Sequence, residues 1–541
     1  MNTKWIVVVR ACGVMALALL FGVCTPMRPG RAADTPRYGG TLIKALGANP
    51  PMFNSAITAD HMAVSAGCLL YNGLIFLDRE GNPKPELAQA WEVKRGGLEF
   101  VFTLQPNAKW HDGKPFTSAD VKFTMEEMLA KYHPRAKAAL ADVTAIETPD
   151  PRTVIIKFSK VFAPFLQVMS CAEAPILPKH LYEGTDVLKN PHNTDNPVGT
   201  GPFKLTEFVR GDHLTFVRNP DFFLPGRPYL DRLILKIIPD ASGRLLAFEK
   251  GELDYIETTY LPKQEHNRLK NKAGFQWKLD TTVPEENYLM FNTERGPATD
   301  KRVRQALMMA IDRKLVLERA AFGLGGPGRN PIDSRFKWAF NPEVDYDKLY
   351  PYDPVRAGRL LDAAGFPKKA DGTRFSMSMV VMSEQPDLPA SAEVVRSNWK
   401  DVGVDVTLDA VERQVMYQRV YTTRNYDATV QSYTSAGDPA IGIHRVYKTD
   451  TSRNPWVNPT GYSNATVDDL LLKASGVVDL GERGKFYKQA QKILAEDIPT
   501  AVLIEKSSVD YASDKFAGFW ESATFFNKFD GVWWKAGREK P

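Results

Sequence analysis

The clearest pattern of hydrophobic and polar positions along this chain lies between Asn287 and Ala321, which reads NYLMFNTERGPATDKRVRQALMMAIDRKLVLERAA. Residues 288–291 form a short apolar and partly aromatic run, which is typical of a buried strand. Gly296 and Pro297 interrupt the polar stretch that follows, as in a loop. We therefore expect a buried strand that leads through a loop into the next element.

That next element has the pattern of an amphipathic helix. Asp300 is suited to the N-cap position, because its carboxylate can accept hydrogen bonds from the first unpaired backbone amides. One apolar stripe follows at helical spacing, formed by Val303, Ala306, Leu307, Ala310 and Ile311. The strand and helix alone specify a piece of core, so any function depends on what lies on either side of them.

The two halves of the chain have different patterns. Residues 290–500 alternate between helical and strand signals, whereas residues 39–285 mix strands and hairpins more freely. The first pattern is typical of an α/β layer structure and the second of an α+β structure. The chain has 541 residues, 43% of them hydrophobic, which is enough for two or more lobes with large cores. The predicted fold class is therefore mixed α/β and α+β with two lobes.

The N-terminus has the order of residues found in secretory signal peptides. Lys4 and Arg10 precede an apolar run over residues 11–23, and the small residues Ala32 and Ala33 follow. The run is too short for a stable membrane-spanning helix. We expect residues 1–33 to be a signal peptide that is cut near Ala33 and directs the protein to the periplasm.

Cys24 offers an alternative, a lipidated N-terminal cysteine, but the preceding Phe21, Gly22 and Val23 fit a lipoprotein signal poorly. Removing residues 1–33 takes away four basic residues and no acid, which lowers the formal net charge from +5 to +1. The remaining basic residues are scattered, so nothing indicates binding of nucleic acid.

Two of the four cysteines, Cys68 and Cys171, lie beyond the predicted signal peptide. In an oxidising compartment they suggest a disulfide, which would close a loop of about 100 residues and stabilise by roughly 4 to 5 kcal/mol in the entropic treatment. Two unpaired buried thiols are the alternative that the sequence leaves open.

No arrangement of catalytic or metal-binding residues emerges from the sequence. The eight histidines include no H-E-x-x-H pair, and the glycines at 323–328 follow a helix rather than a strand, unlike a phosphate-binding loop. Paired acids such as Asp468 and Asp469 fall where solvated helix faces are expected. We therefore expect no enzyme, no metal and no cofactor, and retain an extracytoplasmic hydrolase only as a disfavoured alternative.

Several motifs across the mature chain resemble those of the family 5 extracellular solute-binding proteins, which include the dipeptide-, oligopeptide- and nickel-binding components of ATP-driven importers. They occur in the family's order and are PELAQAWEV (85–93), FTLQPNAKWHDGKPFTSADVKFT (102–124), VGTGPFKL (198–205), VRNPDFF (217–223), FNTERGPATDKRVRQALMMAIDR (291–313), YDPVRAGRLLDAAGF (352–366) and GYSNATVDDLL (461–471). The resemblance implies the bilobal fold of periplasmic binding proteins with an extra insertion subdomain.

The domain boundaries follow from that resemblance. Residues 34–75, 196–287 and 500–541 would form lobe I, residues 76–195 the insertion subdomain, and residues 288–499 lobe II. The strand from Tyr288 to Asn292 would then be the first crossing between the lobes, with a return crossing around Val502. We expect these residues to act as a hinge.

A ligand site between the lobes would use residues on loops at the lobe edges. By resemblance to peptide-binding relatives, the loop before the first helix supplies Thr58 and His61, although a helix N-terminus explains both residues equally well. Arg329 is suited to an anionic group and Trp338 to an apolar one, with a solvated arginine as the alternative.

The third candidate segment, NYDATVQSYTSAGDPA (425–440), contributes Tyr433, Ser435 and Asp438. In peptide-binding relatives, an aspartate three residues before the acidic-proline pair holds the amino group of the peptide. Aligning on Asp438 and the following proline places Ser435 at that position. A buried ammonium without a carboxylate costs several kcal/mol, on the order of 3 to 5, so this departure favours a solute other than an ordinary peptide unless Asp438, equally suited to a turn, compensates.

From these observations we expect the periplasmic component of an ABC importer. It would act as a monomer, bind a peptide or peptide-like solute, and deliver it to a membrane permease and its ATPase. A non-peptide solute such as an opine, a sugar or a metal chelate is the alternative, and a signalling receptor on the same scaffold has no distinguishing sequence feature.

Overall fold

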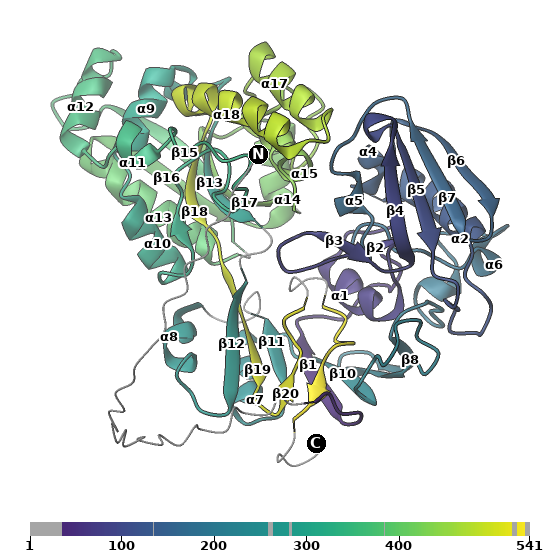
Figure 1. The fold of residues 1–541 in the computed structure, drawn as a ribbon. Helices are drawn as coiled ribbons and strands as arrows, with labels where there is room; N and C mark the ends of the chain where they lie inside the picture. The colour runs from purple at the N-terminus through teal and green to yellow at the C-terminus, as the bar shows by residue number, and fades with distance from the viewer. Residues whose placement is uncertain are drawn as a thin grey trace, which may run out of the picture.

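The computed structural model describes residues 35–133, 135–257, 263–280, 284–383, 385–435, 437–521 and 527–535. The predicted signal peptide and Cys24 lie outside these residues. The chain forms two lobes and a smaller insertion subdomain, which Figure 1 shows beside the two lobes. The predicted bilobal fold with an insertion subdomain is therefore confirmed.

Lobe I is built on a seven-stranded mixed sheet in the order β12-β19-β11-β1-β10-β9-β8. Its central strand β1 pairs in parallel with β10, while β9 and β19 run antiparallel to their neighbours. The strands are β1 (Thr41–Leu46), β8 (Phe203–Val209), β9 (His213–Arg218), β10 (Arg232–Ile237), β11 (Tyr255–Glu257), β12 (Phe275–Asp280) and β19 (Ser508–Ser513). Its helices include α1 (His61–Leu70), α7 (Ala241–Glu249) and α8 (His266–Leu269).

Lobe II contains a six-stranded sheet in the order β14-β18-β13-β17-β15-β16. The strands are β13 (Glu285–Phe291), β14 (Gly326–Pro327), β15 (Phe375–Met382), β16 (Val404–Val411), β17 (Ala428–Thr434) and β18 (Thr500–Glu505). Parallel pairing of β15 with β16 and β17 agrees with the predicted α/β alternation. Its helices are α9 (Lys301–Met309), α10 (Arg313–Ala321), α11 (Tyr346–Leu349), α12 (Pro354–Ala363), α13 (Asp387–Asp401), α14 (Arg413–Met416), α15 (Pro439–Gly442), α16 (His444–Tyr447), α17 (Ala465–Ser475) and α18 (Leu480–Asp497).

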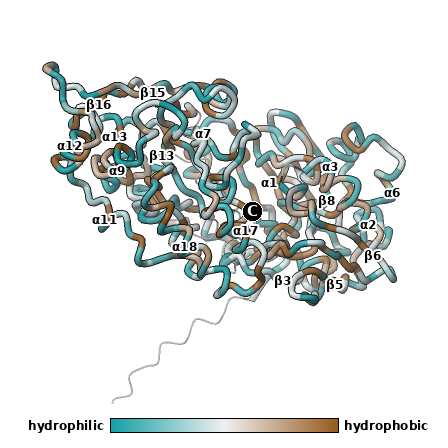
Figure 2. Tube along the Cα trace, turned by 90° about the horizontal axis from the view of Figure 1, so that it is seen from above, coloured by the Kyte–Doolittle hydropathy of each residue, from teal (hydrophilic) through white to brown (hydrophobic). Residues whose placement is uncertain are grey.

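The insertion subdomain has an antiparallel sheet in the order β4-β5-β7-β6. Its strands are β4 (Ala88–Lys94), β5 (Glu99–Leu104), β6 (Val143–Asp150) and β7 (Thr153–Phe158), and the hairpin of β2 (Ile75–Leu77) and β3 (Pro83–Pro85) precedes them. Short helices cover it, namely α2 (Ser118–Phe123), α3 (Ala130–Tyr132), α4 (Ala136–Ala139), α5 (Phe165–Val168) and α6 (Lys179–Tyr182). Figure 2 shows hydrophobic stretches inside this subdomain and inside lobe II, with α6 and α12 at opposite ends of the molecule.

The stretch from Asn287 to Ala321 folds as its pattern predicts. Asp300 caps α9 by accepting a hydrogen bond from the Arg302 backbone amide, and the predicted apolar stripe is buried. Asp312 caps a second helix, α10, so the helical segment divides after Met309. Both helices bury side chains in the same hydrophobic cluster as Leu289 and Phe291 of the strand that begins the stretch.

Lobe I and the insertion subdomain share one hydrophobic core. A single buried cluster runs from Leu42 and Leu233 in lobe I to Phe100 and Phe102 in the insertion, whereas the clusters of lobe II are separate. Burying a common core excludes water between the two parts, so they form one body. Lobe II is therefore the part best able to move as a unit.

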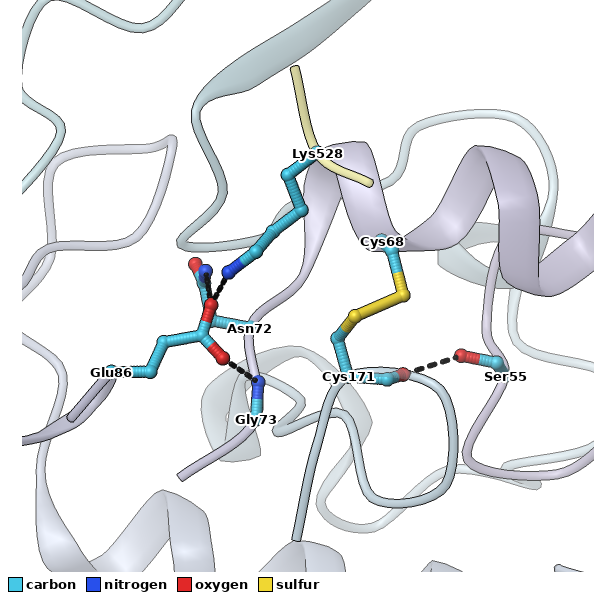
Figure 3. Close-up of a disulfide and its surroundings, with 7 residues drawn as sticks. All are labelled: Ser55, Cys68, Asn72, Gly73, Glu86, Cys171 and Lys528. Atoms are coloured by element: carbon cyan, nitrogen blue, oxygen red, sulfur yellow. Dashed lines mark hydrogen bonds and ion pairs between the residues drawn. A yellow bond between two sulfur atoms is a disulfide. The ribbon is translucent and has the colours of Figure 1, made fainter. Parts of the chain in front are cut away.

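A disulfide and a buried ion pair reinforce this union (Figure 3). Cys68 in α1 is bonded to Cys171 of the insertion, with their Cα atoms 5.5 Å apart, and the Cys171 carbonyl accepts a hydrogen bond from Ser55. The two cysteines are therefore paired. Nearby, the Glu86 carboxylate accepts a hydrogen bond from Asn72 and forms an ion pair with Lys528 of the C-terminal segment.

The crossings between lobes lie beside the predicted hinge residues rather than at them. Tyr288 and Val502 are direct partners in the β13–β18 ladder, and Asn292 donates to the carbonyls of Arg424 and Tyr426. All three therefore lie inside lobe II, where ladder hydrogen bonds restrict bending.

The chain leaves the sheet of lobe I where β12 ends at Asp280 and enters the sheet of lobe II where β13 begins at Glu285. It returns at residues 506–507, where Figure 1 shows β18 continuing into β19. This corrects two predicted boundaries. Residues 285–287 and 500–505 belong to the sheet of lobe II instead of lobe I.

Candidate functional site

Lobe II touches the body formed by lobe I and the insertion subdomain. On the lobe II side the boundary is formed by α15, α17 and the residues after them, and on the other side mainly by the insertion subdomain. The Ala163 backbone amide donates a 2.9 Å hydrogen bond to the Ser475 carbonyl across it. A Cβ on Gly97, whose φ is +97°, would lie 2.6 Å from a methyl carbon of Val478, and Ile441 packs against the shared core. The two bodies are therefore in direct contact in this structure.

Aromatic side chains gather on the lobe II side of this boundary. Tyr433, at the end of β17, lies edge-on to Tyr288 and to Trp456, with ring centres 5.9 and 5.5 Å apart. Its hydroxyl is 2.6 Å from that of Tyr421, which donates to Gln431. Burial raises the pKa of Tyr433 to about 12, so the phenol stays neutral at neutral pH. These residues form a largely buried group, which we call the aromatic cluster.

Arg445 lies over the aromatic cluster. Its guanidinium carbon is 5.0 Å from the centre of the Tyr433 ring, and its nitrogens donate to the carbonyls of Gly442 and Thr434. Among the described residues, no carboxylate lies within ion-pair distance of Arg445. Burial lowers the pKa of Arg445, and the charge of Arg135 lowers it further, although tyrosine neighbours including Tyr433 oppose these shifts.

Arg135 belongs to the insertion subdomain, so an arginine from each body approaches the boundary. The Nε and one terminal nitrogen of Arg135 donate hydrogen bonds of 2.7 and 2.6 Å to the two oxygens of the Glu173 carboxylate. Glu173 follows Cys171 by two residues, so the disulfide to α1 helps to fix its position. The Arg135 guanidinium is therefore held in place by a bidentate ion pair with Glu173, which the disulfide at Cys171 in turn helps to position.

A second polar group lies where the chain crosses between the lobes. Lys506 is 2.8 Å from Glu285 and 3.2 Å from Asp387, and Lys263 of lobe I is 3.3 Å from the same Asp387 oxygen. Burial would raise the pKa of Asp387, but the charges of Lys506 and Lys263 outweigh it and hold this pKa well below its usual value. The ion pairs link the lobes at the crossing.

Thr58 and His61 occupy the N-terminus of α1. The Thr58 hydroxyl accepts a 3.2 Å hydrogen bond from the Asp60 amide, while Asp60 caps the helix. His61 lies with Nε2 3.7 Å from Glu257, which also forms a 2.5 Å ion pair with Lys44. These contacts account for both residues locally, and their role in ligand binding stays a prediction.

Arg329 and Trp338 do not come together. Arg329 is exposed and forms an ion pair with Asp347 at 3.3 Å. The ring of Trp338 covers the buried Arg483, whose guanidinium carbon lies 4.8 Å from the ring centre. Arg329 therefore has the environment of a solvated arginine, and Trp338 that of a structural aromatic.

Asp438 has a structural partner that the sequence did not indicate. Its two oxygens accept bonds of 2.7 and 2.8 Å from Arg483, and it also caps α15 by accepting from the Ala440 amide. Ser435 is buried beside it, and its hydroxyl oxygen has no hydrogen-bond partner among the described residues. The charge of Asp438 is therefore already neutralised by Arg483.

Arg445, Trp456, Tyr421 and Arg135 were missed as site candidates. Arg445 had one usable signal, because the helix segment IGIHRVY holds no acid to pair with it. Trp456 lies in a polar loop between prolines, where a large aromatic has no local packing partner. The charge of Arg135 acts on Arg445 only because the insertion subdomain packs against lobe II, so no local sequence pattern indicates this pair.

The described residues contain no group of three or more His, Cys, Asp or Glu side chains placed to hold a metal ion. Over the same residues, no helix combines the length and apolar character needed to cross a membrane. A hollow of about 290 Å³ lies elsewhere on lobe II, lined by charged residues that include Arg359, Asp362 and Arg374.

Comparison with known proteins gives this arrangement a context. The dipeptide-binding protein of Escherichia coli K12 is 27% identical over 487 residues, which cover 86% of this chain and 88% of that protein. The oligopeptide-binding protein AppA of Bacillus subtilis, solved with a nonapeptide, is 25% identical with a TM-score of 0.77 and is covered in full by 92% of this chain. The periplasmic binding protein AgaA of A. tumefaciens R10, solved with agropinic acid, is 25% identical with a TM-score of 0.75, over 92% of this chain and 99% of that one.

The profile of the bacterial extracellular solute-binding proteins, family 5, matches residues 82–454, which span the insertion subdomain, part of lobe I and most of lobe II. This match covers more than half of the chain, and its fold agrees with the two lobes and insertion described above. The chain belongs to family 5 of the bacterial extracellular solute-binding proteins.

Proposed function

We propose that this protein is the periplasmic component of an ABC importer that captures a small organic solute between lobe II and the body formed by lobe I and the insertion subdomain. The observation that carries this proposal is the aromatic cluster stacked under Arg445, on the segment of lobe II that meets the insertion subdomain. Apolar walls with a few convergent polar groups are typical of small-molecule sites.

Binding would act by shifting the balance between separated and closed lobes. A solute that contacts both bodies favours the closed state by its differential affinity for the two states. The short return crossing at residues 506–507, between β18 and β19, is suited to absorb the change in backbone angles, as in hinge closure of binding proteins. The membrane permease and its ATPase would then receive the closed form.

The peptide-binding relatives favour a peptide or peptide-like solute, and the named complex with agropinic acid favours a non-peptide organic acid. Ser435 and the Asp438–Arg483 pair favour the second, because an ammonium placed there would lack a free carboxylate. We propose no catalysis for either solute, since binding and release suffice.

The proposal is tested by identifying what the protein carries. The mature protein is purified from its native compartment, denatured, and the released small molecules are identified by mass spectrometry. A stoichiometric solute that raises the melting temperature of the stripped protein is expected. Absence of any such solute, together with no thermal shift across a peptide and organic-acid panel, would refute the function.

Two further parts of the proposal have their own checks. N-terminal sequencing of the exported protein should begin near residue 34, whereas an acylated Cys24 would contradict the predicted cleavage. Light scattering of the mature chain should give the mass of a monomer.

A further inference from the structure

Arg445 holds a guanidinium whose hydrogen bonds leave donors available. Its Nε and one terminal nitrogen donate to Gly442 and Thr434 at 3.3 and 3.0 Å, and its other terminal nitrogen has no hydrogen bond to a described residue. The face of the group rests on Tyr433. Stacking and two carbonyl contacts fix the plane of the guanidinium and orient the remaining donors.

The charge around Arg445 is positive without a compensating acid. Arg135 is its charged neighbour across the boundary, and the Arg135 charge is already balanced by Glu173. On the lobe II side, the nearby Asp438 is balanced by Arg483. One full positive charge therefore remains at a partly desolvated position, where attraction to an anion is much stronger than in water.

We infer that Arg445 is the anchor for a carboxylate of the bound solute, with the aromatic cluster receiving the solute's apolar part. This inference rests on the proposed solute-binding function and deepens it by naming the ligand class, an organic anion. The planar guanidinium is suited to a carboxylate because its donors match both oxygens, whereas a compact ammonium would be repelled.

The test compares three variants by calorimetry. R445M removes the charge and keeps much of the stem, R445K keeps the charge but not the planar donors, and R396M is the matched control. Arg396 is an exposed side chain of α13 and pairs with Glu393 at 2.6 Å. The probes are N-acetyl-tri-alanine, its C-terminal amide, and acetate and inorganic phosphate as competitors, together with each solute recovered from the native protein.

The inference predicts that carboxylate probes bind the parent and R396M alike, and that R445M lowers their affinity roughly 30- to 5,000-fold, the range for losing one partner of a desolvated charge pair. The affinity of R445K for the carboxylate probes should lie between those of the parent and R445M. Amidation of the probe should cost the parent a similar factor and cost R445M little. Melting curves establish that each variant is folded, and if R445M does not fold, R445K and the amidated probe carry the test.

The outcomes separate this inference from the function on which it rests. Equal binding of the acid and the amide, or a recovered solute that is neutral or cationic, overturns the role of Arg445 and leaves solute binding intact. Competition by inorganic phosphate but not by acetate overturns the carboxylate assignment in favour of a phosphate. Failure of every probe, with no recovered solute, refutes the proposed function itself.

Discussion

Replacing Asp438 with asparagine tests whether this residue serves the fold or the ligand. Its carboxylate and the Arg483 guanidinium are 3% and 2% exposed, so both charges are screened little by water. Asparagine keeps an oxygen for the cap of α15 but removes the charge that neutralises Arg483. Breaking one partner of such a pair leaves an uncompensated buried charge and costs about 3 to 5 kcal/mol.

Other contacts of Arg483 would remain in D438N. Its Nε still donates to the Ala474 carbonyl at 2.7 Å, and Trp338 still covers its face. We therefore expect destabilisation toward the lower end, about 3 kcal/mol. The double variant D438N/R483M removes both charges and should be more stable than D438N, because an apolar side chain can replace the guanidinium against Trp338 and Tyr487.

Urea unfolding of the mature protein, followed by tryptophan fluorescence, measures these differences as shifts in midpoint at unchanged slope. The matched control is R396M, whose exposed ion pair should change stability by less than about 1 kcal/mol. A D438N protein as stable as its parent but at least tenfold weaker for its solute would refute the reasoning, since Asp438 would then be a ligand group.

Three further predictions concern the crossings and the disulfide. Burial, and then the charge of Asp333, raise the pKa of Glu286 well above its usual value, so the folded state holds this proton more tightly and loses stability as pH rises above about 4.3, the unfolded pKa; E286Q should melt higher than the parent at neutral pH, with the gain shrinking toward pH 4, and parallel melting curves would contradict this. The lowered pKa of Asp387 means that its stabilisation is complete above the unfolded pKa of about 3.9 and is lost progressively as pH falls from there through the lower pKa of the folded state; D387N should cost roughly 2 to 4 kcal/mol at pH 7, and this cost should decrease steadily as pH is lowered below about 3.9, whereas a cost that does not change with pH would show that the ion pairs are not its cause. The double variant C68S/C171S should lose about 2 to 5 kcal/mol in urea unfolding, and a parent whose stability is unchanged by reductant would contradict the disulfide.

The sequence predicted what depends on local pattern. The apolar stripe beginning at Val303, the cap at Asp300 and the alternation of β15 follow from periodicities of helix and strand, and the structure contains each of them. These features need no knowledge of distant contacts.

The remainder depends on contacts between distant segments. Asp438 meets Arg483 across 45 residues, and no spacing rule links them. The crossing was misplaced by a few residues because β13 and β18 are buried along almost their whole length, so their pattern does not show which sheet they join. Arg445 gains its significance only when the insertion subdomain brings Arg135 toward it.

The most direct test of the account is a crystal structure of the mature protein with the solute that it carries. We expect electron density between lobe II and the insertion subdomain, with an anionic group of the solute within hydrogen-bond distance of Arg445 and its apolar part against Tyr433 and Trp456. Density for the solute outside this boundary, with Arg445 unaffected by its presence, would contradict the account.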